Sequence, residues 1–353
     1  MKSLRPFSKI IRMLRPLALL PLPLAAELHE ISNGLNKVTF SGETGVLALS
    51  RIEDRTPFAQ TTFGLRDVTK VSVENGTLVL EFRTDALHFT LPRESPFVRL
   101  DRRIRNPAPN ELHLEKLGFP NLTLDVLNLK APKLRAYGSA SLSGISRNKG
   151  SETFQAVVDP VSRSGVVSGW LTRSRGSGHF ATKIERGKCV LESFYRYHQL
   201  VVEGGKTLET ETLVIGFFPD ARLGLERFAK LSEGAHAEII RHRSPLAHLK
   251  KEALNEFLGD SRRLLLEWRA VDAFDRSPPR IWQAQAGDVN FVAIFNSDPA
   301  KEQATTTSLE KLGLREGSYR AYDIDEKREL GRLDKKLTLK VPSQGSRVIA
   351  LRK

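Results

Sequence analysis

The sequence predicts a mainly β protein, with a large N-terminal antiparallel β-supersandwich, a short helical connector and a small C-terminal antiparallel β-sandwich. Alternating apolar and polar residues dominate residues 27–218, helical spacing is confined to residues 219–277, and alternation returns over residues 278–353. Side chains alternate between faces along a strand, whereas a helical face repeats every three to four residues. The three segments are therefore our predicted domains and connector.

Residues 1–26 resemble a targeting segment, because a basic stretch precedes an apolar run that ends in Ala25 and Ala26. This order is typical of a secretory signal peptide, and the run is too short to span a bilayer. Pro21 and Pro23 interrupt the run. A misassigned start codon, with the domain beginning near Glu27, is the alternative. We expect a periplasmic or extracellular protein if the segment is a true signal and a cytoplasmic one otherwise, with no membrane span elsewhere.

Turn residues divide the N-terminal segment into strands. Asn75-Gly76 separates two alternating runs, which predicts a hairpin with a type I′ turn, since that turn needs positive φ at both central positions. Residues 98–105 alternate strictly, and residues 194–202 and 208–218 read as two further strands around a Gly-Gly turn. The basic, Ser- and Gly-bearing stretch of residues 135–151 is predicted to be a long loop.

Two helices are expected in the connector. Asp220 can cap a helix in which Leu225 and Phe228 share a face. Ser244 and Pro245 are a good N-cap and first residue for a second helix, which ends at Gly259. Its apolar stripe, which we expect to pack on a sandwich or on another chain, is Leu246, Leu249, Ala253, Leu254, Phe257 and Leu258.

The C-terminal segment begins after Pro278 and Pro279. Short apolar runs follow at residues 281–282, 291–295, 318–322, 337–341 and 347–351. Strands of this length and spacing are typical of a small antiparallel sandwich.

The number of cysteines and the spacing of the histidines argue against a metal or redox site. Cys189 is the single cysteine, which excludes an intramolecular disulfide and a Cys-rich zinc site. His236, His242 and His248 recur every six residues, whereas helical metal pairs fall four apart, so we interpret them as solvated. We expect no metal and no cofactor.

The formal net charge is +14. Outside the leader, the basic residues concentrate at Lys130, Lys133, Arg135, Arg147 and Lys149. Such a patch is compatible with a polyanion-binding surface, but an ordinary basic solvated face explains it as well. We expect no nucleic-acid partner.

Two stretches resemble a known family. Residues 165–180 and 208–228 resemble the end of the N-terminal supersandwich of melibiase-type α-galactosidases and their raffinose-synthase-like relatives. Residues 278–282, 291–298 and 312–323 are similar to the C-terminal sandwich of the same enzymes. Asp323-Ile324-Asp325 departs from that pattern, because the family commonly has an aromatic residue in the third place.

The resemblance implies a glycoside hydrolase whose (β/α)₈ barrel carries two catalytic aspartates between these two regions. Such a barrel needs roughly 250 residues, and the interval 219–277 is far shorter. The catalytic aspartates therefore have no matching positions, and we predict no catalytic residues. Asp272 with Asp275, and Asp323 with Asp325, are close in sequence, but we interpret them as solvated turn or helix-end carboxylates.

Gly176-Ser177-Gly178-His179 marks the candidate carbohydrate site. One interpretation is a loop at the rim of a sugar site, in which Trp170 provides a stacking surface, Arg173 or Arg175 donates hydrogen bonds, and His179 contributes. The alternative is a glycine-assisted hairpin or bulge.

Three functions remain open. The first is a carbohydrate-associated protein, related to α-galactosidases and non-catalytic alone, with a galactoside-type ligand. The second is a fragment or split subunit of an α-galactosidase-type hydrolase, whose partner is a barrel-containing chain or a second copy of this chain. The third is a basic polyanion-binding surface module.

Overall fold

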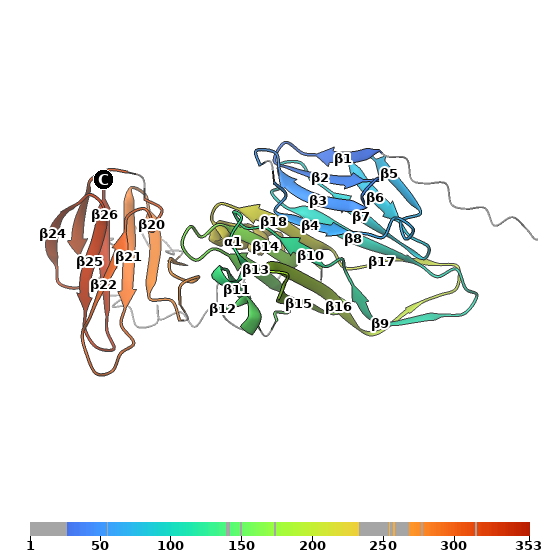
Figure 1. Cartoon of the computed structure of the whole chain (residues 1–353). Helices are drawn as coiled ribbons and strands as arrows, with labels where there is room; N and C mark the ends of the chain where they lie inside the picture. The colour runs from blue at the N-terminus through green and yellow to red at the C-terminus, as the bar shows by residue number, and fades with distance from the viewer. Residues whose placement is uncertain are drawn as a thin grey trace, which may run out of the picture.

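The computed structural model describes residues 27–54, 56–138, 142–148, 150–172, 174–232, 254, 257, 268–276, 278–314 and 316–353. These residues form two β bodies that lie side by side, a large N-terminal sandwich and a smaller C-terminal one (Figure 1). The predicted mainly β class is confirmed. The predicted leader, and the three histidines at six-residue spacing, lie outside the described residues.

The large sandwich consists of two antiparallel sheets. Sheet 1 has the order β1 (Leu28–Ser32), β2 (Asn36–Ser41), β3 (Val46–Arg51), β4 (Ala59–Thr62), β10 (Leu122–Leu124), β16 (Lys188–Val202) and β15 (Gly176–Glu185), and β9 (Leu112–Gly118) also pairs with β16. Sheet 2 has the order β12 (Leu142–Gly144), β11 (Arg135–Gly138), β13 (Phe154–Val158), β14 (Gly165–Trp170), β18 (Leu213–Phe218), β8 (Val98–Arg105), β7 (Asp85–Thr90), β6 (Thr77–Glu81) and β5 (Lys70–Glu74), and β17 (Thr207–Glu209) also pairs with β8.

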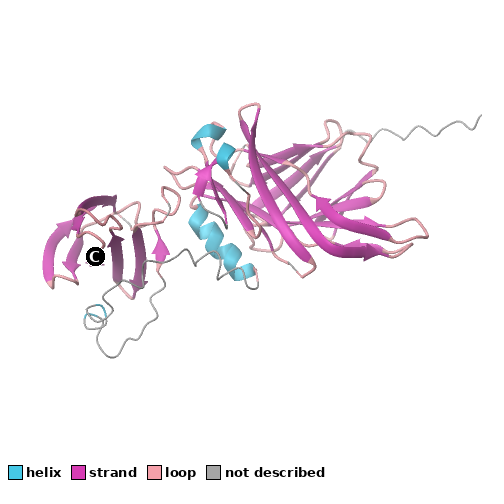
Figure 2. Ribbon diagram, turned by 90° about the horizontal axis from the view of Figure 1, so that it is seen from below, coloured by secondary structure: helices cyan, strands magenta, loops and turns pink. Residues whose placement is uncertain are grey.

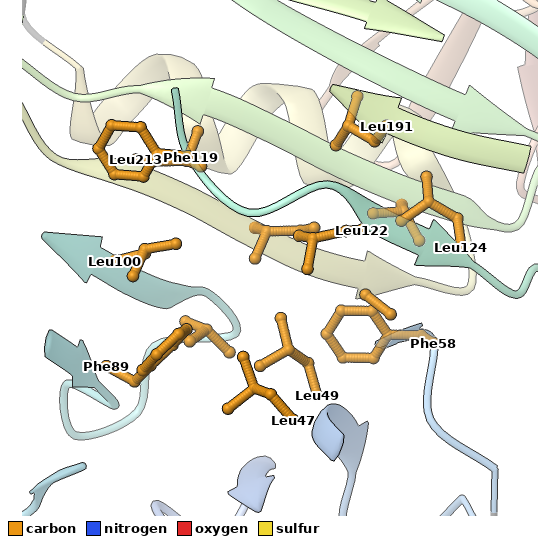
Figure 3. Packing of buried hydrophobic residues seen from close by; sticks show 14 of the residues in the cluster. Leu47, Leu49, Phe58, Phe89, Leu100, Phe119, Leu122, Leu124, Leu191 and Leu213 are labelled. Carbon is orange, nitrogen blue, oxygen red and sulfur yellow. The ribbon is translucent and has the colours of Figure 1, made fainter. Parts of the chain in front are cut away.

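Apolar side chains from the inner faces of the two sheets fill the space between them. Figure 3 shows leucines and phenylalanines of both sheets in contact, among them Leu47, Leu49, Phe89, Leu100 and Leu213. All five are buried. Period-two patterning produces this core because each strand sends alternate side chains inward.

The turn and strand predictions for the large sandwich hold in most places. Asn75 and Gly76 have φ values of 49° and 74° and join β5 to β6, so the predicted type I′ hairpin is confirmed. The predicted strand over residues 208–218 is interrupted, because β17 ends at Glu209 and β18 begins at Leu213.

The predicted loop over residues 135–151 is partly wrong. It contains β11, β12 and the 3₁₀ turn η2 (Ile145–Arg147), and another such turn, η1 (Ala131–Lys133), precedes it. The Ser- and Gly-rich composition of this stretch gives no strand signal for β11. These residues form a strand because all of β11 pairs with β13.

Helix α1 (Ala221–Leu231) directly follows β18 in the chain, as predicted. The Asp220 carboxylate accepts a hydrogen bond from the Arg222 N–H at 3.0 Å, which caps the helix. Phe228 packs against Gly169 of β14, where a Cβ atom would lie 2.2 Å from the phenyl ring. Figure 2 shows α1 on the side of the large sandwich that is nearer to the C-terminal body. Among the described residues, none belongs to a helix with the length and apolar character needed to cross a membrane.

The C-terminal body also has two sheets. Sheet 3 has the order β19 (Arg269–Ala270), β20 (Ile281–Ala286), β21 (Val289–Phe295), β26 (Ser346–Arg352), β23 (Tyr319–Asp323) and β24 (Arg328–Leu333), and β22 (Gln303–Ser308) pairs with β25 (Lys336–Val341) in sheet 4. Buried side chains of both sheets, including Val292, Leu337 and Ile349, form their common core.

Most of the second predicted helix, residues 244–259, lies outside the described residues, but two members of its apolar stripe are described. Leu254 is buried in a cluster with Trp282 and Phe291 of sheet 3. The Phe257 ring stacks on Tyr322, with ring centres 5.5 Å apart, and meets Phe291 edge-on at 6.0 Å. These two residues therefore pack on the C-terminal sandwich, as we expected of the stripe.

The contact between Leu254 and sheet 3 can be tested by truncation. Leu254→Ala should lower the free energy of unfolding of the C-terminal body by about 2–5 kcal/mol, because it removes buried methyl groups and leaves a cavity. Urea titration followed by Trp282 fluorescence measures the change. Val161→Ala is the control, since that side chain is 91% exposed. Equal midpoints for both variants would contradict the burial.

Candidate functional site

A polar groove of about 800 Å³ lies where the segment after β14 meets the start of β15. Arg99 of β8 and Leu231 at the end of α1 lie on one side of it. Its other lining residues are Glu152, Thr153, Leu171, Thr172, Ser174, Gly176, Ser177 and Gly178. Four of these carry hydroxyl groups, so the lining is rich in neutral donors and acceptors with one guanidinium and one carboxylate.

Backbone and side-chain hydrogen bonds hold the segment after β14 in place. The Leu171 N–H donates to the Thr212 carbonyl at 2.9 Å, and the Thr212 N–H donates to the Thr172 hydroxyl at 3.0 Å. The Thr212 hydroxyl in turn donates to Asp101 of β8 at 2.5 Å. Leu171 and Thr172 of the groove wall are therefore both bonded to Thr212, which is in turn bonded to β8.

The edge strand β15 presents backbone groups to the groove. Phe180 exchanges two backbone hydrogen bonds with Ser151, at 2.7 and 2.9 Å, on the side away from β16. Backbone groups of alternate residues in an antiparallel strand point to the same side. Gly178 consequently directs its N–H and C=O away from β16, and it lines the groove.

Trp170 lies beneath this edge. Its side chain is 0% exposed and contacts Phe119, Phe180 and Tyr195 in the core of the large sandwich. A Cβ atom on Gly178 would lie 2.1 Å from the indole ring, so only glycine leaves room for the tryptophan. The prediction that Trp170 provides a sugar-stacking surface is wrong, because the ring points between the sheets.

Arg175 belongs to a buried ionic network. Its Nε donates to the carboxylate of Glu211 at 2.8 Å, and its Nη2 donates to the Glu209 carbonyl at 2.7 Å. Glu211 is 0% exposed, and its second oxygen accepts a hydrogen bond from the Tyr197 hydroxyl at 2.7 Å. Burial, reinforced by the adjacent Glu211 carboxylate, raises the pKa of Tyr197. These contacts make Arg175 an anchor for the strand that starts at Gly176.

His179 lies on the outer face of sheet 1 and is not among the groove-lining residues. Its ring stacks on Phe194 with centres 5.0 Å apart, and its Nε2 is 3.2 Å from the Ser177 hydroxyl. Arg173 lies outside the described residues. The Gly176–His179 motif is the start of β15, which forms a hairpin with β16 in unbroken register, so the motif lies in a hairpin strand and contains no bulge.

Sequence reasoning located the segment but missed most of the lining. Arg99 and Glu152 are distant in sequence from Ser177, and only the pairing of sheets brings them to one groove. One clue was that Arg99 lies between Val98 and Leu100, two buried apolar residues of β8, and therefore on the opposite face of the strand.

The aspartates that we interpreted as solvated are in fact bonded, and two are buried. Asp272 accepts hydrogen bonds from the N–H groups of Arg280 and Ile281, and burial raises its pKa in spite of them. Asp323 is 0% exposed and pairs with Arg347. Asp275 pairs with Lys311, and Asp325 accepts from the Val348 N–H at 2.8 Å. The interpretation as solvated carboxylates was wrong for Asp272 and Asp323, which are buried, whereas Asp275 is an exposed turn residue as expected.

Cys189 is a buried free thiol, and burial raises its pKa to about 12, which agrees with the predicted core role. Among the described residues, no group of three or more His, Cys, Asp or Glu side chains is placed to hold a metal ion.

Comparison with known proteins gives partial matches. No family model and no curated protein matches the sequence. A GH27 β-L-arabinopyranosidase from Geobacillus stearothermophilus is 30% identical over 21% of this chain and 17% of its own, with a TM-score of 0.20. An α-galactosidase from Lactobacillus brevis is 9% identical over 60% of this chain and 42% of its own, with a TM-score of 0.41.

A third match covers nearly the whole of the matched protein. The Slr1438 protein from Synechocystis sp. PCC 6803 is 10% identical over 56% of this chain and 98% of its own, with a TM-score of 0.35. This chain therefore spans less than half of the two glycosidases and nearly all of the third protein.

The close approach at Gly178 predicts intolerance to any side chain there. Gly178→Ala should destabilise the large sandwich by about 1–3 kcal/mol, because the added methyl group overlaps the Trp170 ring. Chemical denaturation followed by tryptophan fluorescence measures this. Gly144→Ala is the matched control, since a Cβ atom there meets nothing within 4 Å. A Gly178→Ala variant as stable as Gly144→Ala would refute the packing.

The raised pKa of Tyr197 predicts a loss of stability in alkali. The unfolded chain releases the tyrosine proton near pH 10, while the folded chain retains it, so stability falls as pH rises above about 10. Tyr197→Phe should cost about 1.5–3 kcal/mol near neutral pH, because it removes a hydrogen bond to a charged group, and this deficit should shrink above pH 10. Denaturation midpoints from pH 7 to 11, with Tyr322→Phe as control, test this. A deficit that stays constant with pH would count against it.

Proposed function

We propose that this protein binds a galactoside-type saccharide in the groove beside β15 and does not hydrolyse it. The observation that carries the proposal is the lining itself. Hydroxyls, the Arg99 guanidinium and the outward backbone groups of Gly178 converge on one concave surface. Saccharides present many hydroxyls, and sites that bind them need several fixed donors and acceptors rather than a single strong charge.

The sequence resemblance to α-galactosidases supports the saccharide class. The resembling residues 165–180 contain β14, the groove-forming segment after it and the start of β15. The resembling segment thus supplies six of the ten described lining residues of the groove.

The carboxylates argue for binding without hydrolysis. Glycosidases of both stereochemical classes use two carboxyl groups that flank the scissile bond at a set separation. Among the described lining residues, Glu152 is the one carboxylate. The nearby Asp101 and Glu211 are engaged by Thr212, Arg175 and Tyr197. The described lining therefore does not supply the two carboxyl groups that a glycosidase places on either side of the scissile bond.

Calorimetric titration with melibiose and raffinose tests the binding. Arg99→Ala should weaken binding about tenfold, because a charge-assisted hydrogen bond is worth about 1.5–3 kcal/mol. Arg332→Ala, on the exposed face of β24, is the control and should leave affinity unchanged. Thermal melting of both variants checks that the fold is intact. The absence of binding by the wild type, or equal binding by Arg99→Ala and wild type, would refute this site.

The same preparation tests catalysis. We expect no turnover of nitrophenyl α-galactoside by protein free of host enzymes. Turnover of about 1 per second or faster, which is ordinary for an enzyme, would instead support the hydrolase alternative.

A further inference from the structure

The outer face of sheet 1 carries a basic and aromatic surface where β9, β16 and β15 lie side by side. Arg196 of β16 stands directly opposite Lys116 of β9 on one side and Ser177 of β15 on the other. Phe194, two residues before Arg196, stands between Gly118 and His179. We call the surface formed by Lys116, Phe194, Arg196, Ser177 and His179 the cationic platform.

Two like charges oppose each other on this platform. Directly opposite side chains in an antiparallel pair have Cβ atoms about 4.5–5.5 Å apart, and like charges there destabilise the sheet. Lys116 and Arg196 are both exposed, and within the described part of the chain neither has a carboxylate within 4 Å. Lys183, farther along the same face of β15, shows the usual arrangement, since it pairs with Glu185 and Glu192.

The Phe194 ring holds both cations close together. The Lys116 ammonium is 3.9 Å from the ring centre, and the Arg196 guanidinium carbon is 5.5 Å from it. Cation–π attraction of this kind contributes about 0.5–1 kcal/mol at exposed sites. It fixes the position of the charges but does not neutralise them, so their N–H donors remain available to an anion.

His179 lies at one side of the platform, and the charges of the platform affect its pKa. Burial, and then the positive charges of Arg196 and Lys116, lower the pKa of His179, while Glu152 opposes the change. The lowered pKa favours the neutral imidazole, and its Nε2 lies within hydrogen-bond distance of the Ser177 hydroxyl, at 3.2 Å. An anion bound between Lys116 and Arg196 would offset their charges and raise the His179 pKa.

The platform and the groove meet at Ser177. Ser177 lines the groove, and its hydroxyl contacts His179 on the platform. A ligand that extends from the groove over the edge of β15 would thus bring its next ring or substituent beside Arg196, which is the cross-strand neighbour of Ser177.

We propose that the cationic platform binds an oxyanion substituent, a carboxylate or a sulfate, of a saccharide whose neighbouring ring occupies the groove. This inference rests on the saccharide-binding function proposed above and adds that the ligand is an acidic glycan. Guanidinium and ammonium groups form their strongest hydrogen bonds with such oxyanions. The unpaired like charges on adjacent strands are then explained by the ligand that they bind.

Three probes of similar length separate the possibilities: a neutral α-galacto-oligosaccharide, an oligogalacturonate and a sulfated galactan oligosaccharide. Titration at about 50 mM salt should show at least tenfold tighter binding of one or both acidic probes than of the neutral one. The acidic probe that binds identifies carboxylate or sulfate as the recognised group. Raising the salt concentration should weaken only acidic binding, because ions screen exposed charges.

Substitutions locate the effect. Lys116→Ala and Arg196→Ala should each weaken acidic binding about tenfold and leave neutral binding unchanged. Lys188→Ala is the matched control, because Lys188 is an exposed cation at the other end of β16. In the wild type, the pKa of His179 measured by NMR should rise when the acidic probe is added and stay constant with the neutral probe.

The outcomes distinguish the two proposals. Equal affinity for neutral and acidic probes, or acidic binding that survives both substitutions, would overturn the cationic platform and leave saccharide binding in the groove intact. If none of the three probes binds, both proposals fail. Tight acidic binding that depends on Lys116 and Arg196 but not on Arg99 would contradict both the groove site and a ligand that spans groove and platform, because the anion would then bind without a ring in the groove.

Discussion

The large sandwich depends, at the end that carries the groove, on the burial of Trp170 beneath Gly178. The indole contacts Phe119, Phe180 and Tyr195, and it occupies the space that any side chain at residue 178 would need. This contact joins the end of β14 in sheet 2 to the start of β15 in sheet 1. Residues of both segments line the groove, so the packing of this ring helps to position them.

Buried ions stabilise this arrangement in a second way. Glu211 would be costly to bury alone, but Arg175 and Tyr197 supply a charge and a hydrogen bond to its two oxygens. In the C-terminal body, Asp272 and Asp323 are satisfied by backbone N–H groups and by Arg347. These partners satisfy the buried carboxylates and fix the backbone around them.

The two bodies also touch directly. Tyr137 of β11 meets Phe274 edge to face with ring centres 5.5 Å apart, and the Arg163 guanidinium donates to the Lys311 carbonyl at 2.6 Å. Helix α1 lies beside these contacts, with Glu226 paired to Arg269. The described groove lining comes from the large sandwich and α1, and the C-terminal body contributes none of it.

The sequence by itself determined the features that depend on neighbouring residues. Asn75-Gly76 specifies its hairpin because few other residue pairs adopt positive φ at two consecutive positions. Asp220 marks the start of α1 because its side chain caps the first turn. Sequence patterning likewise identified some strands of the large sandwich, among them β8 and β16, and most strands of the C-terminal body. The tertiary structure alone decided which side chains are exposed at the site. It placed Trp170 in the core, engaged Arg175 with Glu211, and brought Arg99 and Glu152 to one groove. The physical reason is that the apolar and polar pattern of a strand shows only that its side chains alternate between two faces. Which strand or helix covers each face depends on pairing between segments that are far apart in the chain.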